Sequence, residues 1–212
     1  MNAVQTFQSK APGVMAQLIR DFPVLTPLDA AAIVGNCGHE SAGLTILQEI
    51  KPTVPGSKGG YGWPQWTGPR RRAYEAYCKR NNLDPASDQA NYAYLFIELK
   101  GIEGSEGGAI AKTVKAVGLE NKVKAFEQAF LRAGVKHYPS RIQWAERALE
   151  AWRSAKPGIP IPNPTPTPKP NPAPSPAPEW GQPEKPGTTM AAVVVGVVVA
   201  IVAVIWFVFI KR

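Results

Sequence analysis

The sequence predicts a mainly α-helical domain, followed by a proline-rich linker and a single transmembrane helix. Three observations divide the 212-residue chain in this way. In residues 1–155, apolar side chains recur at helical rather than alternating spacing. Thirteen of the 22 prolines fall within residues 156–187, and so much proline excludes a packed core. The 21 residues from 190 to 210 carry no charge and as a helix would reach about 31 Å, roughly the thickness of a bilayer's hydrocarbon core. We therefore place the domain at 1–155, the linker at 156–189 and the transmembrane helix at 190–210.

The helices of the domain follow from apolar periodicity and from start and stop signals. The first helix ends before Pro23, because the residue preceding a proline is pushed out of the α region, and its apolar face consists of Val14, Leu18, Ile19 and Phe22. The second helix runs to about Glu40 from a start signal made of Thr26, Pro27 and Asp29. Residues 51–68 are rich in glycine and proline without a helical period and predict a loop. Further helices are predicted over residues 70–81, 88–100, 108–117, 120–133 and 140–155.

The linker alternates proline with small or polar residues between Ile159 and Pro178, a pattern that favours polyproline II. Such a chain rises about 3.1 Å per residue and acts as a semi-rigid spacer. A ligand for proline-recognising domains is the competing interpretation. In the final segment, aromatic residues gather near one end, and Lys211 and Arg212 follow, which by the positive-inside rule places them in the cytoplasm. Residues 1–20 lack the apolar core of a signal peptide, so the topology of the domain stays open.

The composition narrows the chemistry to carboxylates. The chain has two histidines and two cysteines, so a zinc site is not expected, and no metal or cofactor is predicted. His39-Glu40 resembles the start of a zinc motif, but Gly43 stands where that motif needs its second histidine. Cys37 and Cys78 are interpreted as small buried apolar residues rather than as a redox pair.

Glu40 is the first candidate for chemistry, because an apolar helix carries it. A carboxylate held in an apolar cleft has its charged form disfavoured and can serve as a general acid. The simpler alternative is a solvated glutamate at a helix end. His39 is a candidate to orient Glu40. The alternative is a histidine at a helix end with a structural role or none.

The loop around Gly59–Gly68 has the composition of a saccharide cleft. Its glycines allow close approach of the backbone to a ligand, aromatic faces suit sugar rings, and an amide can bond hydroxyl and N-acetyl groups. The candidate substrate-binding residues are Tyr61, Gln65, Trp66 and Thr67. Taken alone, the same loop is equally compatible with a structural aromatic corner.

The two segments occur in an order that is similar to a known family. Gly35-Asn36 with Glu40-Ser41 is followed by Gly60-Tyr61-Gly62 with Gln65-Trp66-Thr67, and the C-terminal portion contains Tyr138-Pro139-Ser140-Arg141, Trp144 and Trp152. Over about residues 25–153 this pattern resembles the phage tail lysozyme family. The resemblance implies a lysozyme-like helical fold, peptidoglycan as the substrate and Glu40 as the catalytic acid. It also implies that Tyr61, Gln65, Trp66 and Thr67 line the cleft, although Trp63 and Pro64 depart from the expected loop.

A glycosidase ordinarily uses two carboxylates. The loop 51–68 contains no second acid, and the nearest candidates are Glu49, Glu98, Glu103 and Glu106, with Glu98 expected in a buried hydrogen-bonded pair. If Glu40 acts alone, either water or the C6 hydroxyl of the muramic acid attacks the anomeric carbon. The first gives hydrolysis and the second gives lytic transglycosylation.

The positive net charge of the domain agrees with an anionic bacterial cell wall as its partner. Residues 1–155 hold 19 Lys/Arg and 14 Asp/Glu, a net charge of +5, which speeds encounters with polyanions. The cluster Arg70-Arg71-Arg72 is not interpreted as a nucleic-acid site. Arg72, Lys79 and Arg80 share a helix with apolar residues, which favours a solvated basic face.

Together these features predict a membrane-anchored phage muramidase that cleaves the MurNAc–GlcNAc bond of peptidoglycan during infection or lysis, as an endolysin or a virion enzyme. Its partners would be peptidoglycan and, through residues 190–210, a lipid bilayer, in the virion or at the host inner membrane. The alternatives are a lytic transglycosylase and a non-catalytic wall-binding virion protein, and a pore former is disfavoured by the single span. The oligomeric state is not encoded in any pattern.

Overall fold

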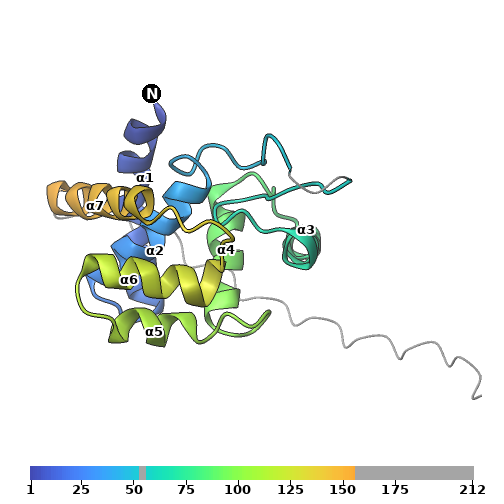
Figure 1. Cartoon of the computed structure of the whole chain (residues 1–212). Helices are drawn as coiled ribbons and strands as arrows, with labels where there is room; N and C mark the ends of the chain where they lie inside the picture. Colours follow the sequence, from blue (N-terminus) through green and yellow to red (C-terminus); the bar gives the residue numbers. More distant parts are fainter. Residues whose placement is uncertain (53–55, 156–212) are drawn as a thin grey trace, which may run out of the picture. The chain divides into compact units, whose positions relative to one another are not determined.

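The structure, a computed structural model, describes residues 1–52 and 56–155 and has helices throughout this part of the chain (Figure 1). Strand pairing among the described residues is confined to two isolated bridges, which join Tyr61 to Gln48 and to Trp66. The mainly α prediction is therefore confirmed for these residues. The elements are α1 (Ala3–Asp21), α2 (Pro27–Glu40), α3 (Gly68–Asn81), α4 (Asp88–Leu99), α5 (Ala109–Lys115), α6 (Leu119–Phe126), the π-helical turn η1 (Glu127–Leu131) and α7 (Tyr138–Ser154).

The predicted linker and the predicted transmembrane helix lie outside the described residues. Within residues 1–52 and 56–155, no helix combines the length and the apolar character that a membrane span requires.

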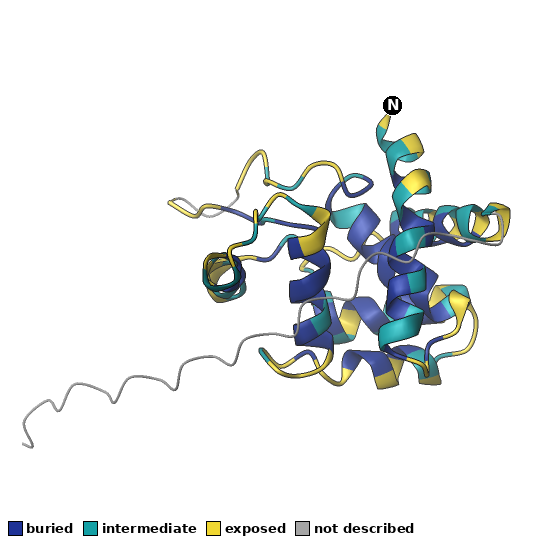
Figure 2. Ribbon diagram, turned by 180° about the vertical axis from the view of Figure 1, so that it is seen from behind, coloured by how far each residue is buried: buried dark blue, intermediate teal, exposed yellow. Residues whose placement is uncertain are grey.

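Helix α2 is the central element, and α1, α6 and α7 pack around it. Its start was predicted correctly: Thr26 accepts a hydrogen bond from the Asp29 backbone, and the Asp29 side chain accepts one from the Thr26 backbone. All residues from Asp29 to Gly38 are buried, and Figure 2 shows α2 and α4 mostly in the colour of buried residues. A helix that is buried on every side belongs in a core, and α2 thereby carries its last residue, Glu40, outward from the centre of the domain.

A glycine brings α7 unusually close to α2. A Cβ atom added at Gly35 would lie 2.4 Å from the Ala145 backbone, a distance that real side chains do not tolerate. Only the absence of a side chain at this position allows the two helices to approach so closely. The consequence for the site is that the first turns of α7 lie against the last turns of α2.

Helix α1 begins earlier than the apolar pattern indicates. Asn2 and Gln5 form a reciprocal capping box that starts the helix at Ala3. Pro12 lies inside the helix without ending it and is itself buried. The helix ends, as predicted, before Pro23.

The predicted helix over residues 120–133 is divided in the structure. It runs as α6 to Phe126, continues as the π-helical turn η1, and stops at Arg132, whose φ of 56° is left-handed. π-Helical turns occur frequently at functional sites. Here the turn ends the helix, and the non-helical segment from Arg132 to His137 connects it to α7.

The predicted solvated face holds for Arg72 and Lys79, which are exposed, but the first two arginines of the basic cluster are partly buried. Arg70 donates to both carboxylate oxygens of Glu98, at 2.8 and 2.9 Å, and to the Phe130 carbonyl. Arg71 donates to the Lys58 and Gly59 carbonyls and covers the Tyr61 ring at 5.0 Å. These arginines fasten Gln48, the residues 58–61 and the end of η1 to α3, a role that charge patterning alone does not reveal.

Both cysteines are free and buried, as predicted. Burial raises the pKa of the Cys37 thiol to about 12 and that of Cys78 to about 11, so both thiols stay protonated near neutral pH.

Candidate active site

Glu40 lies at a cleft of about 430 Å³, within the size range of ligand-binding sites. The cleft is bounded by the end of α2, by the loop between α2 and α3, and by the segment that follows η1. Besides Glu40, its lining consists of Glu49, Gly60, Pro64, Gln65, Thr67, Leu131, Arg132, Ala133 and Gly134. The last turn of the central helix therefore presents a carboxylate to a cavity made from two segments that are far apart in sequence.

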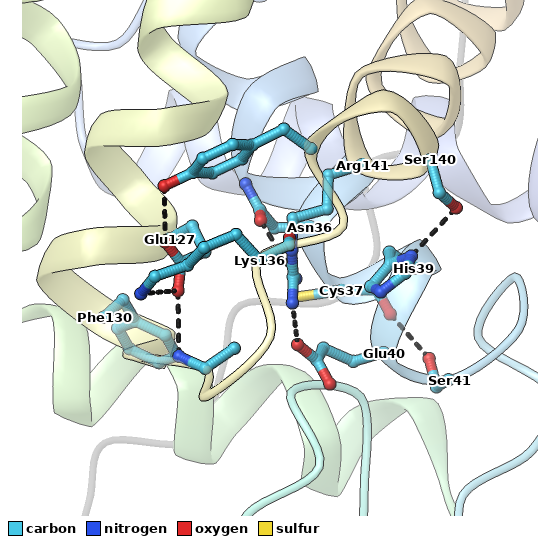
Figure 3. A network of polar contacts seen from close by, with 12 residues as sticks. Asn36, Cys37, His39, Glu40, Ser41, Glu127, Phe130, Lys136, Ser140 and Arg141 are labelled. Atoms are coloured by element: carbon cyan, nitrogen blue, oxygen red, sulfur yellow. Dashed lines mark hydrogen bonds and ion pairs between the residues drawn. The ribbon is translucent and has the colours of Figure 1, made fainter.

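The Glu40 carboxylate is held by a buried arginine from α7 (Figure 3). Arg141 Nη2 donates to Glu40 Oε1 at 2.7 Å, and the side chains are 1% and 19% exposed, respectively. The remaining donors of Arg141 are directed to Asn36 Oδ1 at 3.2 Å and to the Lys136 carbonyl at 2.6 Å. Three fixed acceptors leave the guanidinium one orientation, so Glu40 meets a charged donor in a defined place.

Asn36 joins the helices that build this arrangement. Its amide donates to the Ala32 carbonyl within α2 and to the Val123 carbonyl of α6, at 2.9 and 3.1 Å. The amide oxygen is left to accept from Arg141. The segment Gly35-Asn36 therefore has two physical roles, since Gly35 allows α7 to approach and Asn36 orients the arginine that approaches with it.

His39 lies beside this network and does not contact Glu40 in it. Its Nδ1 atom is 2.9 Å from Ser140 Oγ, and its ring centroid is 5.6 Å from that of His137. Burial, together with the charges of Arg141 and His137, lowers the pKa of His39 from 6.5 to about 4. The imidazole is therefore neutral near pH 7. Among the described residues, no group of three His, Cys, Asp or Glu side chains could hold a metal ion.

Two of the four predicted substrate-binding residues line the cleft, Gln65 and Thr67. The Gln65 amide donates to the Leu47 and Gly62 carbonyls, both at 2.9 Å, so its donors hold the loop together. Thr67 is exposed at the N-terminus of α3 and makes no capping hydrogen bond. The Thr67 hydroxyl is therefore available to a ligand or to a water molecule, whereas the NH₂ group of Gln65 is already bonded within the loop.

The other two predicted residues lie outside the cleft lining. Trp66 is only 1% exposed, and its indole donates to Glu98 Oε2 at 2.7 Å. Its ring packs against Tyr74 and Tyr94 in the core, which leaves no open face for a sugar. Tyr61 is partly buried beneath the Arg71 guanidinium. In this part of the loop the aromatic residues form the structural corner that the sequence left as the alternative.

The structure separates the four candidates for a second carboxylate. Glu98 lies in a buried hydrogen-bonded pair, as predicted; burial raises its pKa despite the hydrogen bonds from Arg70. Glu106 is also buried, which by itself raises its pKa, but the hydrogen bond from Arg132, the charge of Arg70 and the hydrogen bonds from Ser105 together outweigh burial and lower the pKa. Glu103 pairs with Arg80 at 2.9 Å.

Glu49 differs from these three acids, because it lines the same cleft as Glu40. Its Oε2 atom accepts from the Gly60 amide at 2.6 Å, and its own amide donates to the Gly60 carbonyl at 2.9 Å. The loop thereby fixes the Glu49 carboxylate through one oxygen, Oε2.

A comparison with protein families gives one match. The family model described as phage tail lysozyme covers residues 15–152, from α1 to α7. The chain belongs to the phage tail lysozyme family. A search of curated proteins and a search of solved structures each gave no match. Family membership supports a phage peptidoglycan hydrolase-like function for the chain, with peptidoglycan as the implied substrate.

Two parts of the site were not predicted from the sequence. Arg141 is 101 positions from Glu40 and was noted only as part of a family-like segment. Of the cleft-lining residues Leu131–Gly134, the first three were predicted as the end of a helix. No local pattern could have paired either with Glu40, because the contacts arise from the packing of α7 on α2 and from the π-helical turn.

Proposed function

We propose that the domain is a muramidase that hydrolyses the MurNAc–GlcNAc bond of peptidoglycan, with Glu40 as general acid and Glu49 as the second carboxylate. The observation that carries this proposal is the placement of both side chains in one cleft of a lysozyme-family domain. A pair of carboxylates that flank the scissile bond is the usual requirement for glycoside hydrolysis.

Glu40 would donate its proton to the glycosidic oxygen as the bond from that oxygen to the anomeric carbon breaks. The Glu40 carboxylate that results is the form that accepts a hydrogen bond from Arg141, so the arginine stabilises the acid after its proton has left. At the same time, Glu49 would take a proton from the water whose oxygen bonds to the anomeric carbon. The products are two shorter glycans, one with a new hydroxyl and one with a reducing end.

The water needs a partner that orients it. Thr67 supports this part of the proposal, because its hydroxyl lines the cleft and is not used to cap α3. With a second carboxylate and a free hydroxyl in the cleft, we favour hydrolysis over attack by the C6 hydroxyl of the substrate.

Conversion of Glu40 to glutamine tests the function. The full chain, solubilised in detergent, would be assayed on dye-labelled peptidoglycan alongside Glu49→Gln and the control Glu146→Gln. Glu146 is exposed on α7 outside the cleft lining. Because general acid catalysis contributes roughly 10²–10⁴-fold, we expect Glu40→Gln to lower the rate by about a hundredfold or more.

Glu49→Gln should also be strongly impaired, and the control should keep the wild-type rate. Near-normal activity of a correctly folded Glu40→Gln protein would refute the assignment. A wild-type protein that binds peptidoglycan without cleaving it would support the non-catalytic wall-binding alternative.

We also propose that residues 190–210 anchor the enzyme in a lipid bilayer and that residues 156–189 are its spacer. The support is the uncharged length of the first segment and the proline content of the second. The enzyme would then act near a membrane, in the virion or at the host inner membrane.

A further inference from the structure

Glu127 is a buried carboxylate that the proposed chemistry does not use. It is the first residue of the π-helical turn η1 and is 0% exposed. Burial of a charged group is costly unless hydrogen bonds and an opposite charge compensate for it. The groups that donate hydrogen bonds to the Glu127 carboxylate therefore indicate the role of this buried residue.

The hydrogen-bond partners of the Glu127 carboxylate in the described part of the chain come from one short segment, which we call the wall segment (residues 132–138). Oε1 accepts from the Ala133 amide at 2.8 Å and from Lys136 Nζ at 3.1 Å, and Oε2 accepts from the Tyr138 hydroxyl at 3.0 Å. One carboxylate thus holds the beginning, the middle and the end of the wall segment. Figure 3 shows its contact with Lys136.

The wall segment contacts the site at two places. Its first residues, Arg132–Gly134, line the cleft. Its Lys136 carbonyl accepts from Arg141 Nε at 2.6 Å, and the same guanidinium donates to Glu40. A continuous path of contacts therefore leads from Glu127 through Lys136 and Arg141 to the proposed general acid.

We propose that Glu127 is a positioning residue for Glu40, and that it acts by fixing the Lys136 carbonyl that orients Arg141. This inference rests on the proposed role of Glu40. A carboxylate suits the task better than an amide. Glutamine would offer only one acceptor oxygen and would turn its NH₂ group toward at least one of the three donors.

The main test is the kinetics of Glu127→Gln in the full chain. A displacement of about 1 Å at a reacting group costs up to roughly a hundredfold in rate, so we expect kcat to fall by about tenfold or more while KM changes little. Lys136→Gln should show the same change to a smaller degree. Because the Lys136 side chain is 44% exposed, this variant provides a second test with little risk to the fold.

A double-mutant cycle with Arg141→Lys tests the path. If Glu127 acts through Arg141, the two changes will lower kcat by less than the product of their separate effects. Asp29→Asn is the matched control, because Asp29 is an equally buried acid that pairs with Lys122 at 2.6 Å at the other end of α2. It should lower stability and leave kcat of the folded protein unchanged.

An NMR measurement keeps the inference separate from the proposed function. The Arg141 Nε–H group should exchange slowly with solvent in the wild type and faster in Glu127→Gln, whatever the catalytic activity. Unchanged exchange together with unchanged kcat would overturn the inference and leave the role of Glu40 intact. An inactive wild type with faster exchange in Glu127→Gln would refute the proposed function and keep the contact path.

Discussion

At the scale of the single residue, the site depends on Arg141, whose guanidinium is held in one orientation beside Glu40. Arg141 has an acceptor for Nε and for each terminal nitrogen, two of them on α2 and one in the wall segment. A guanidinium can meet this requirement because its donors form a rigid planar fork, and an ammonium group cannot. A mutation of Arg141 can therefore keep its positive charge and remove the fixed geometry of its hydrogen bonds.

Arg141→Lys should keep a positive charge near Glu40 but lose the defined orientation. We expect the rate of peptidoglycan hydrolysis to fall by about tenfold or more, because a point charge cannot satisfy all three acceptors. The measurement is steady-state kinetics with a thermal melt of the same preparation. Wild-type rates in a folded Arg141→Lys protein would show that only the charge matters.

His39 should make stability depend on pH. Its pKa is lowered in the folded protein, from 6.5 to about 4, so the unfolded state binds a proton more readily between these values. The free energy of unfolding should therefore fall as the pH decreases from about 6.5 to about 4. In His39→Asn this contribution disappears, so the difference in stability from the wild type should change with pH across that range.

Urea unfolding at a series of pH values measures this difference. A constant difference between wild type and His39→Asn from neutral pH to pH 4 would contradict the burial of a neutral imidazole at this position.

At the scale of the element, the close packing of α2 and α7 brings the site together. Gly35 allows the contact with Ala145, and Arg141 lies one turn before Ala145 on the same helix. A side chain at Gly35 would therefore act on the domain's stability and on the active site together.

Gly35→Ala should destabilise the domain and lower activity. The added methyl group would lie 2.4 Å from the Ala145 backbone, and overpacking of this kind typically costs about 1–3 kcal/mol. Gly13→Ala is the matched control on α1, where nothing lies within 4 Å of the new Cβ. This control should be neutral or stabilising by up to about 1 kcal/mol. Equal melting temperatures for the two variants would mean that α7 can move away without cost.

The helices were largely predictable because their signals are local. The start of α2 was read from Thr26 and Asp29, and its apolar residues indicated a buried helix that delivers Glu40 to the site. The π-helical turn was not predictable, since its sequence has the same periodicity as α6. Arg141 and Glu127 were not predictable as site components either, because each acquires its role from contacts between separate elements.

In the aromatic loop, by contrast, the sequence predicted site residues that the structure places outside the cleft. Its composition suggested sugar binding, and residue types alone could not tell a ring face open to solvent from one packed in a core. The Trp66 indole N–H donates its hydrogen bond to Glu98 inside the domain. The cleft instead takes Gln65 and Thr67 from the same loop.

At the scale of the whole molecule, the domain carries a net charge of +5, which favours encounter with an anionic wall. The proposed anchor would add a second effect, since tethering raises the effective concentration of an enzyme near its substrate without changing its active site.

A protein truncated after residue 155 tests both parts of this proposal. The helices of the described domain pack on one another, so we expect it to be soluble, helical by circular dichroism and cooperative in unfolding. It should hydrolyse soluble wall fragments at the rate of the full chain and be weaker on intact cells. Aggregation of the truncated protein would show that residues 156–212 supply part of its core, and equal activity on cells would remove the case for a tether.

The most direct test of the central claim, that Glu40 and Glu49 direct water to the glycan, is the chemistry of the product. Purified peptidoglycan would be digested by the full chain in water enriched in heavy oxygen, reduced at once with borohydride and analysed by mass spectrometry. We predict muropeptides whose new reducing ends carry one heavy oxygen atom, and none above background with Glu40→Gln. Products that end in 1,6-anhydro-muramic acid, without heavy oxygen, would contradict the claim.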